Sequence, residues 1–279
     1  MTSDDDGVAA DSMPFSARSL ALSLLLGTHP PRLSTSVLVA GGSLFGINAG
    51  TMRTALSRMS AKGEVAATAD GYELAGRLIE RQLRQDQGRR SPTPEWDGRW
   101  CVITPLHAAR QLADRRDLRR RLERAGFGEL RPDFWLRPVN RDLPDFGSDL
   151  LVTVGELRVD NLDSLVERLW PVADLEAEAE RLLAETRRAT RREAELDGGD
   201  PEPDLDSWLV ETFTVSAGIV RFLTSEPRLP PSLVAQPWAP DVLRRDYNGL
   251  ERLFQGHLAR YLRRQQEAVT SPAAAESRR

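Results

Sequence analysis

The stretch Asn48-Ala49-Gly50-Thr51-Met52-Arg53-Thr54-Ala55-Leu56-Ser57-Arg58-Met59 is the most informative part of this 279-residue chain. Its apolar residues Met52, Leu56 and Met59 recur at spacings of four and three, which predicts a helix with a single apolar stripe. Asn48 stands where an N-cap belongs, and Lys62-Gly63 supplies the stop signal at the other end. We therefore expect an amphipathic helix between these two signals.

The opposite face of this predicted helix carries hydroxyls and arginines and no carboxylate. These groups donate hydrogen bonds, which suits the acceptors on phosphates and on base edges. We therefore predict a DNA-recognition helix, in which Arg53 or Arg58 contacts guanine. The alternative without DNA binding is a three-helix core with a solvated polar face, in which each arginine is an ordinary surface residue. The predicted DNA-binding residues are Thr51, Arg53, Thr54, Ser57 and Arg58 on the helix, with Arg32 and Lys62 as phosphate contacts at the edges of the predicted elements.

The surrounding sequence supports a winged helix-turn-helix. Two further helices are expected upstream, over residues 16–26 and 34–45, and Gly46 ends the second. Downstream, Asp70-Gly71 separates two short runs, 64–68 and 72–74, which is a hairpin signal and would form the wing. The order of helix, helix, turn and helix is that of a helix-turn-helix.

The rest of the chain divides into an α+β part and a helical part. Strands are expected near 101–104, 134–137 and 150–154, with 157–159 as a further candidate. Helices are expected over 108–125 and 164–169. The resulting order of strands and helices is close to that of a ferredoxin-like unit. Later helices are expected over 175–195, 207–223 and 241–264, with an acidic break at 197–206. The predicted domains are a disordered acidic N-terminus (1–15), a winged-helix domain (16–86), a linker (87–95), a ferredoxin-like middle domain (96–172), an α-helical C-terminal domain (173–264) and a disordered tail (265–279).

Composition excludes several classes of protein. No apolar run approaches the roughly 20 residues that a membrane helix needs, and the acidic first fifteen residues do not form a signal peptide; we therefore expect a cytoplasmic protein. Cys101 is the single cysteine, which excludes a disulfide framework. Although the net charge is −4, residues 16–90 carry ten basic against five acidic residues. Local positive charge is what a phosphate backbone requires.

Four motifs together resemble the PaaX family of phenylacetate-pathway repressors. They are Arg53 to Arg58, Trp96 to Trp100 (WDGRW), Gly126 to Trp135, and Glu226 to Leu233 followed by Trp238. The resemblance implies a dimeric bacterial transcriptional regulator with a winged helix, a ferredoxin-like middle domain and a helical domain that serve in dimerisation and effector sensing. In the best-known branch of that family the effector is phenylacetyl-CoA, which other branches need not share; we expect an aryl- or acyl-CoA effector and no cofactor. Two departures are the short hairpin with Asp70, which disfavours phosphate contact by the wing, and the acidic insert at 197–206.

A second group of residues is a candidate effector site. The basic helix at 108–125 could face CoA phosphates or DNA, but Asp114, Asp117 and Glu123 are spaced for ion pairs, which favours a salt-bridged surface. The aromatic residues nearby are expected to be core residues before they are a ligand cage, and Cys101 is expected to be a buried, inert thiol. The speculative effector-binding residues are Trp96, Trp100, Arg119, Arg120 and Trp135.

Enzymatic functions find little support. His29, His107 and His257 lack the spacing of metal ligands, and there is no nucleophile elbow or P-loop. Ferredoxin-like CRISPR nucleases use an Asp at the end of the first strand, where this chain has Thr104-Pro105.

We expect a repressor that binds a palindromic operator as a homodimer and is released by a small effector. The alternatives are a ligand-binding enzyme or accessory factor that uses the winged helix to bind proteins, and a structural protein without a ligand.

Overall fold

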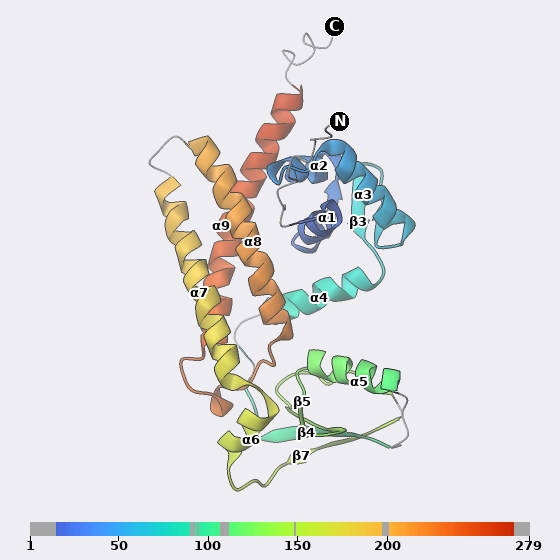
Figure 1. Cartoon of the computed structure of the whole chain (residues 1–279), viewed down its shortest axis with the longest axis vertical. Coiled ribbons are helices and arrows are strands. Elements are labelled where there is room, and N and C mark those ends of the chain that lie inside the picture. Colours follow the sequence, from blue (N-terminus) through green and yellow to red (C-terminus); the bar gives the residue numbers. More distant parts are fainter. Residues whose placement is uncertain are drawn as a thin grey trace, which may run out of the picture. The chain divides into compact units, whose positions relative to one another are not determined.

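The computed structural model describes residues 15–89, 93, 95–106, 112–147, 149–196 and 201–270. Its contacts divide the chain into two compact units. Unit 1 consists of Met1–Leu83, Glu193–Thr214 and Arg252–Arg279, and unit 2 consists of Arg84–Arg192 and Val215–Glu251. Figure 1 labels the elements in chain order. Of the expected disordered segments 1–15 and 265–279, residues 1–14 and 271–279 lie outside the described residues, as do His107 and Arg110.

Three helices form the first part of unit 1. They are α1 (Ala17–Leu26), α2 (Thr35–Leu44) and α3 (Ala49–Ala61), and each pair of them is in contact. Each begins with a side-chain cap, in which Ser16, Ser34 and Asn48 accept a backbone N–H of the first turn. Apolar residues of all three helices are buried in the common core, among them Leu20, Leu38 and Leu56.

A three-stranded antiparallel sheet accompanies these helices. It consists of β1 (Arg32–Ser34), β2 (Val65–Ala67) and β3 (Gly71–Leu74), in the order β1-β3-β2. A Cβ on Gly71 would collide with the Leu33 carbonyl oxygen, so only glycine allows β1 to approach β3 here. The β2–β3 hairpin was expected, whereas β1, which follows two prolines, was expected as a loop.

The remaining parts of unit 1 are the start of α4 (Arg77–Arg89) and stretches of two long helices. Gln82 in α4 is buried and donates to the carbonyl oxygens of Leu26 and Thr28 at 3.1 and 2.9 Å. Phe213 from α8 (Pro201–Ser225) and Phe254 from α9 (Ala239–Thr270) lie against each other with ring centroids 6.1 Å apart. The helical C-terminal part, expected as a separate domain, thus contributes residues to both units.

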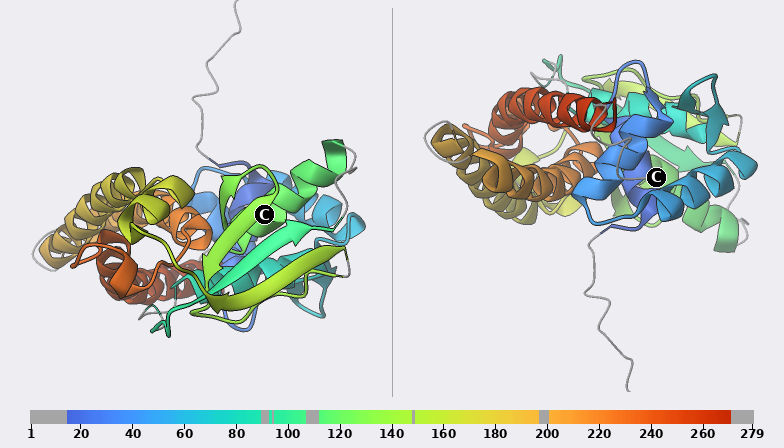
Figure 2. Two further views of the ribbon diagram at one scale, coloured as in Figure 1. Left: turned by 90° about the horizontal axis from the view of Figure 1, so that it is seen from below. Right: turned by 90° about the horizontal axis from the view of Figure 1, so that it is seen from above.

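Unit 2 contains a four-stranded antiparallel sheet with a helix on each face (Figure 2). Its strands are β4 (Arg99–Pro105), β5 (Gly128–Arg131), β6 (Phe134–Pro138) and β7 (Leu150–Glu156), in the order β5-β6-β4-β7. One face packs its Ile103 and Trp135 against α5 (Leu112–Arg124). The other packs Trp100 and Leu136 against α6 (Leu162–Leu169).

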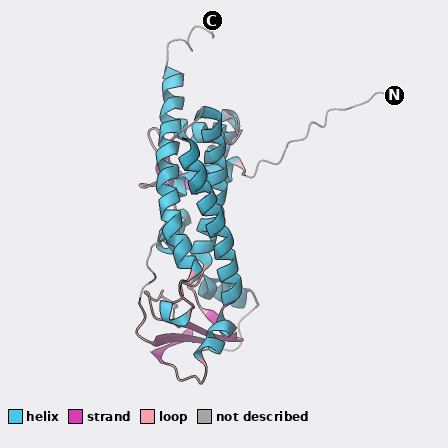
Figure 3. Cartoon of the chain, turned by 90° about the vertical axis from the view of Figure 1, so that its left-hand side faces the viewer, coloured by secondary structure: helices cyan, strands magenta, loops and turns pink. Residues whose placement is uncertain are grey.

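A third cluster of buried residues in unit 2 lies among three long helices. The side chains that meet there include Leu182 of α7 (Val172–Glu195), Ile219 of α8 and Leu243 of α9. Figure 3 shows these three helices running side by side. A short 3-10 turn, Pro231–Leu233, precedes α9, and its Leu233 joins the core on the α6 side of the sheet.

The fold is mixed α+β with antiparallel sheets and helical N- and C-terminal parts, as the sequence predicted. Four local expectations are corrected. Residues 128–131 form strand β5, which was not expected, whereas 157–159 are not a strand. The expected acidic break ends earlier, because α8 already begins at Pro201, and α9 continues to Thr270 into the expected tail.

Candidate nucleic-acid interface

Helix α3 has the caps and the buried stripe that the sequence predicted. Asn48 Oδ1 accepts the backbone N–H of Thr51 at 2.8 Å. Met52, Leu56 and Met59 are at most 1% exposed. Gly63, just after the helix, has a φ of +68°, a left-handed conformation that favours glycine. Local signals therefore fix both ends of α3 and the face that it turns inward.

The opposite face of α3 is exposed to solvent. All five residues predicted to contact DNA there are exposed: Thr51, Arg53, Thr54, Ser57 and Arg58. The Thr54 hydroxyl donates to the Gly50 carbonyl oxygen at 2.9 Å, so its hydrogen is already engaged within the helix. The structure thus brings the predicted side chains together on one surface, and the two arginines supply its positive charge.

The cations around this surface fall into two groups. Arg18 on α1 forms two hydrogen bonds with the Glu64 carboxylate, at 2.7 and 2.9 Å, and Arg32 pairs with Asp70 at 2.9 Å. Among the described residues, no carboxylate forms an ion pair with Arg53 or Arg58. The predicted phosphate contact Arg32 therefore already has an anionic partner, whereas the two arginines of α3 remain available to an external anion.

The two carboxylates are held in their charged form by these pairs. The hydrogen bond from Arg18 lowers the pKa of Glu64, and nearby Lys62 lowers it further. The hydrogen bond from Arg32 lowers the pKa of Asp70, and the Thr68 hydroxyl contributes a second hydrogen bond. Asp70 thus accepts hydrogen bonds from β1 and from its own hairpin, which accounts for an acidic residue at this turn.

A groove of about 650 Å³ runs between α3 and the start of α1. Ser16 and Arg18 line it from α1, and Asn48, Thr51 and Arg58 line it from α3. Glu64 lies at the same groove, so one carboxylate sits among several donors. Sequence reasoning did not include Arg18 or Glu64 in the site, because nothing local signals a pair 46 residues apart.

The five residues considered for an effector site are not brought together. Trp100 is buried on the α6 side of the sheet, in an edge-to-face contact with the half-buried Trp96. Trp135 is buried on the α5 side, where Arg119 lies over its ring. On α5, Arg119 pairs with Glu129 and Arg120 pairs with Asp117, as expected of a salt-bridged surface.

Other groups of chemical interest lie in the interior. Cys101 is fully buried, and burial raises the pKa of its thiol, which makes the reactive thiolate scarcer. In the part of the chain that the structure describes, no three His, Cys, Asp or Glu side chains form a metal site. His257 contacts Glu193 at 2.7 Å and the Trp208 ring at 5.0 Å between centroids.

No helix among the described residues has the length and apolarity to cross a membrane.

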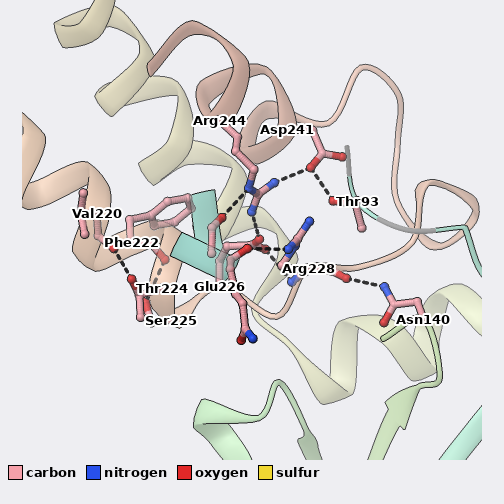
Figure 4. A network of polar contacts seen from close by, with 12 residues as sticks. Thr93, Asn140, Val220, Phe222, Thr224, Ser225, Glu226, Arg228, Asp241 and Arg244 are labelled. Carbon is pink, nitrogen blue, oxygen red and sulfur yellow. Dashed lines mark hydrogen bonds and ion pairs between the residues drawn. The ribbon is translucent and has the colours of Figure 1, made fainter. Parts of the chain in front are cut away.

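Unit 2 contains a buried charged network that the sequence did not reveal (Figure 4). Arg244 and Glu226 are fully buried and form an ion pair. Arg244 also donates to Asp241 and to the Gly88 carbonyl oxygen, the latter at 2.8 Å. Asp241 accepts a further hydrogen bond from Thr93 at 2.7 Å. The network therefore links the end of α8, the start of α9 and the segment after α4.

Two family models match the chain, and a solved structure is similar to it. Residues 16–78 match the model of PaaX-like proteins, and residues 93–144 match the model of the PaaX protein central Cas2-like domain. The uncharacterized protein Rv0674 from Mycobacterium tuberculosis is 30% identical in sequence, with a TM-score of 0.69; the similarity covers 88% of this chain and 98% of that chain. No curated protein matches. The two matched segments contain α3 and the strands β4 to β6, respectively.

Proposed function

The chain belongs to the PaaX family and is a transcriptional regulator. From this premise, we propose that residues 16–78 act as a winged helix that binds double-stranded DNA. In this proposal α3 enters the major groove, and the β2–β3 hairpin is the wing. The observation that carries it is the exposed face of α3, whose two arginines have no carboxylate partner among the described residues.

The proposal assigns roles to individual side chains. Arg53 or Arg58 makes a bidentate contact to guanine, which contributes about 1–3 kcal/mol of discrimination against a wrong base. Thr51 and Ser57 donate to phosphate oxygens beside it, and Lys62 at the end of α3 adds a further phosphate contact. Arg18 and Arg32 contribute less, because a phosphate must compete with Glu64 and Asp70 for them.

We further propose that the protein is a repressor that binds a palindromic operator as a homodimer. Two copies of α3 would then enter successive major grooves about 34–36 Å apart. A small effector, an aryl- or acyl-CoA thioester, would release the operator by favouring a dimer geometry in which the two helices are misaligned. A ligand shifts such an equilibrium only as far as its affinities for the two geometries differ.

The decisive test is a gel-shift titration on DNA from the region upstream of the protein's own gene. Arg53→Ala combined with Arg58→Ala should weaken binding by roughly 30-fold or more, since each lost contact costs at least about 1 kcal/mol. Arg119→Ala combined with Arg120→Ala removes two arginines that are also exposed but are paired with carboxylates, and serves as the matched control. Equal affinity of the α3 variant and the wild type would refute DNA reading by α3.

Two further arms address salt and effector. Binding should weaken steeply when salt is doubled, because each neutralised phosphate releases a counterion. A panel of aryl- and acyl-CoA thioesters added at fixed salt should contain one that releases the DNA. A specific, salt-sensitive shift that no thioester releases would retain the DNA-binding regulator and reject this effector class.

A further inference from the structure

The groove between α1 and α3 has more positive than negative charges. The described residues that line it include three cations, Arg18, Arg58 and Lys62, and one carboxylate, that of Glu64. Arg18 and Glu64 neutralise each other, because they form an ion pair at 2.7 Å. Arg58 and Lys62 are exposed, and no carboxylate among the described residues pairs with either of them. The described lining of the groove therefore carries two positive charges in excess.

Two helix N-termini contribute to the same groove. Ser16 and Ala17 line it from the start of α1. Asn48 and Gly50 line it from the start of α3. Neither helix has an acidic residue in its first turn. The N–H groups and the partial positive charge of a helix N-terminus attract carboxylates and phosphates, so both helices add to the preference of the groove for an anionic chain.

An acidic segment joins the described chain at the edge of this groove. Residues 1–14, which lie outside the described residues, include four aspartates and no basic residue. They connect to Phe15, whose ring contacts Phe45 and Phe213 edge-to-face, at 5.9 and 5.3 Å between centroids. The next residue, Ser16, caps α1 and lines the groove. The contacts of Phe15 therefore hold one end of the acidic segment beside the groove.

The spacing of the aspartates is sufficient to reach the cations. Asp11 stands four residues before Phe15 and Asp6 stands nine before it. An extended chain covers about 3.4 Å per residue, so these aspartates can lie up to roughly 14 and 31 Å from Phe15. Helix α3, with 13 residues, is about 20 Å long. The segment is therefore long enough to place carboxylates along the whole of α3.

We propose that, in the protein without DNA, the acidic segment of residues 1–14 occupies the groove between α1 and α3, with its aspartates against Arg58 and Lys62, and that DNA must displace it. This inference rests on the proposed DNA binding by α3 and gives it an internal competitor. The aspartates take the place that phosphates occupy in the complex. An acidic partner protein would meet the same cations, but residues 1–14 are already joined to the edge of the groove.

Covalent attachment makes a weak contact effective. A short flexible connection gives an effective concentration of roughly 1 mM. A contact with an intrinsic dissociation constant of about 0.25 mM then fills the groove in most molecules. Since only the unoccupied fraction binds DNA, the apparent DNA affinity is lowered about fivefold.

The first test uses the single lysine of the chain, Lys62. A carbodiimide forms an amide between a carboxylate and an amine that are in contact. In wild type without DNA, peptide mass spectrometry should find Lys62 linked to an aspartate of residues 1–14, with a yield that does not change on dilution. Lys62→Arg keeps the charge but removes the amine, so the link should disappear. An excess of the upstream DNA should also suppress the link in wild type.

Two results of this experiment would overturn the proposal. Wild type in which Lys62 is linked only to Glu64, or is not linked at all, has no acidic segment in the groove. A link whose yield falls on dilution joins two copies of the chain, and the competitor is then not internal.

The second test is a gel-shift titration with the upstream DNA. The segment is neutralised by combining Asp4→Asn, Asp5→Asn, Asp6→Asn and Asp11→Asn. This variant should bind about fivefold more tightly than wild type at about 0.1 M salt, and the difference should shrink as salt screens the contact. Wild type should show the shallower salt dependence, because cations that the segment already neutralises release fewer counterions on binding DNA.

A control variant separates the groove contact from the net charge of the protein. It neutralises four exposed acidic residues of unit 2 and so makes the same change in net charge. Its DNA affinity should stay within about twofold of wild type, because the effect of net charge alone is screened at this salt concentration. The four changes are Asp160→Asn, Asp163→Asn, Glu167→Gln and Glu180→Gln. An equal gain in both variants would overturn the proposal.

The two tests distinguish a failure of this inference from a failure of the proposed function. The cross-link to Lys62 is measured without DNA and reports only on the groove. If the neutralised segment left DNA affinity unchanged while Arg53→Ala combined with Arg58→Ala weakened it, the internal competitor would be refuted and DNA binding by α3 retained. A dilution-independent link to Lys62 together with the fivefold gain supports the inference.

Discussion

The arginines of α3 and those of unit 2 differ in what they contact, although 37 of the 38 basic residues in the chain are arginine. On α3, Arg53 and Arg58 are exposed, and no carboxylate among the described residues pairs with them. In unit 2, Arg119 and Arg120 pair with carboxylates at the surface, and Arg244 does so in the interior. Arg137 is also buried and donates to three backbone carbonyl oxygens instead.

This difference shows why counting basic residues is a poor guide to function. Helix α5 carries more arginines than α3, but two of them are engaged with Asp117 and Glu129. An arginine that already has a carboxylate must give it up before it binds a phosphate, whereas an unpaired exposed arginine loses only water and counterions. Ion pairing therefore reduces the number of α5 arginines that are available to a phosphate, whereas both arginines of α3 remain available.

The largest expected effect follows from breaking the buried pair in unit 2. Arg244→Met leaves the fully buried carboxylate of Glu226 without its partner, which should lower the free energy of unfolding by about 3–5 kcal/mol. Urea denaturation at pH 7 measures this. The folded fraction should keep the DNA affinity of wild type, because the role of Arg244 is structural.

Two further variants serve as comparisons for the loss of stability in Arg244→Met. Arg187→Ala breaks an exposed pair with Asp246 and should cost less than about 1 kcal/mol. Arg244→Met together with Glu226→Met removes both charges and should recover part of the loss, since apolar replacement of a whole buried pair is often tolerated. A single Arg244→Met variant as stable as Arg187→Ala would show that the network does not support unit 2.

The next effect comes from making α3 resemble α5. Ser57→Glu places a carboxylate four residues after Arg53 on the exposed face, where it can pair with that arginine and repel phosphates. Affinity for the upstream DNA should fall at least tenfold in a gel-shift titration, while helix stability changes by only a few tenths of a kcal/mol. Ser57→Gln has nearly the same size without the charge. If both variants bound DNA alike, the charge pattern of α3 would not matter.

The sequence predicted those parts of the molecule that depend on neighbouring residues. The cap at Asn48, the stripe of Met52, Leu56 and Met59, and the hairpin turn at Asp70-Gly71 are all local signals, and each appears in the structure. Strand β5 was missed because Gly-Glu-Leu-Arg has little intrinsic strand preference. Its conformation depends on pairing with β6, which no local pattern reports.

Charge pairing between distant residues was the least predictable feature. The partners Arg18 and Glu64 are 46 residues apart, and Arg32 and Asp70 are 38 apart, so only the folded chain brings them together. From sequence alone, Arg32 was a phosphate contact and Asp70 an obstacle to DNA. The structure shows that they pair with each other, which changes the expectation for both residues.

A smaller gain is expected from releasing a paired arginine at the α3 groove. Glu64→Gln removes a negative charge from the groove and frees Arg18. DNA affinity should rise about threefold, and the salt dependence should steepen by about one phosphate contact. Arg18→Ala alone should lower the affinity instead, since it leaves the Glu64 carboxylate at the groove without its cation. A gel-shift series at several salt concentrations measures both quantities.

The same pair predicts a pH dependence. The pKa of Glu64 is lower in the folded protein than in the unfolded chain, because Arg18 donates hydrogen bonds to its charged form. Its contribution to stability is therefore present above the unfolded value and is lost as the pH falls through the folded value. Thermal unfolding midpoints of wild type and Glu64→Gln should approach each other as the pH falls below the unfolded value of about 4.3. A difference between the two midpoints that stays constant over this pH range would contradict the stabilising role of the Arg18–Glu64 pair.

The smallest effects are expected on α5, and they test whether pairing matters there for the fold or for DNA. Arg119→Ala removes an ion pair with Glu129 and a contact over the Trp135 ring, and should cost about 0.5–1 kcal/mol of stability. Arg120→Ala removes a pair in which both side chains are more than half exposed, so its cost should be close to zero. Because the paired arginines of α5 have no proposed role in DNA reading, both variants should bind the upstream DNA within about twofold of wild type. A larger loss of DNA affinity in either variant would mean that ion pairing with a carboxylate does not distinguish structural arginines from DNA-binding arginines in this protein. Helix α5 would then be part of the DNA interface as well as α3.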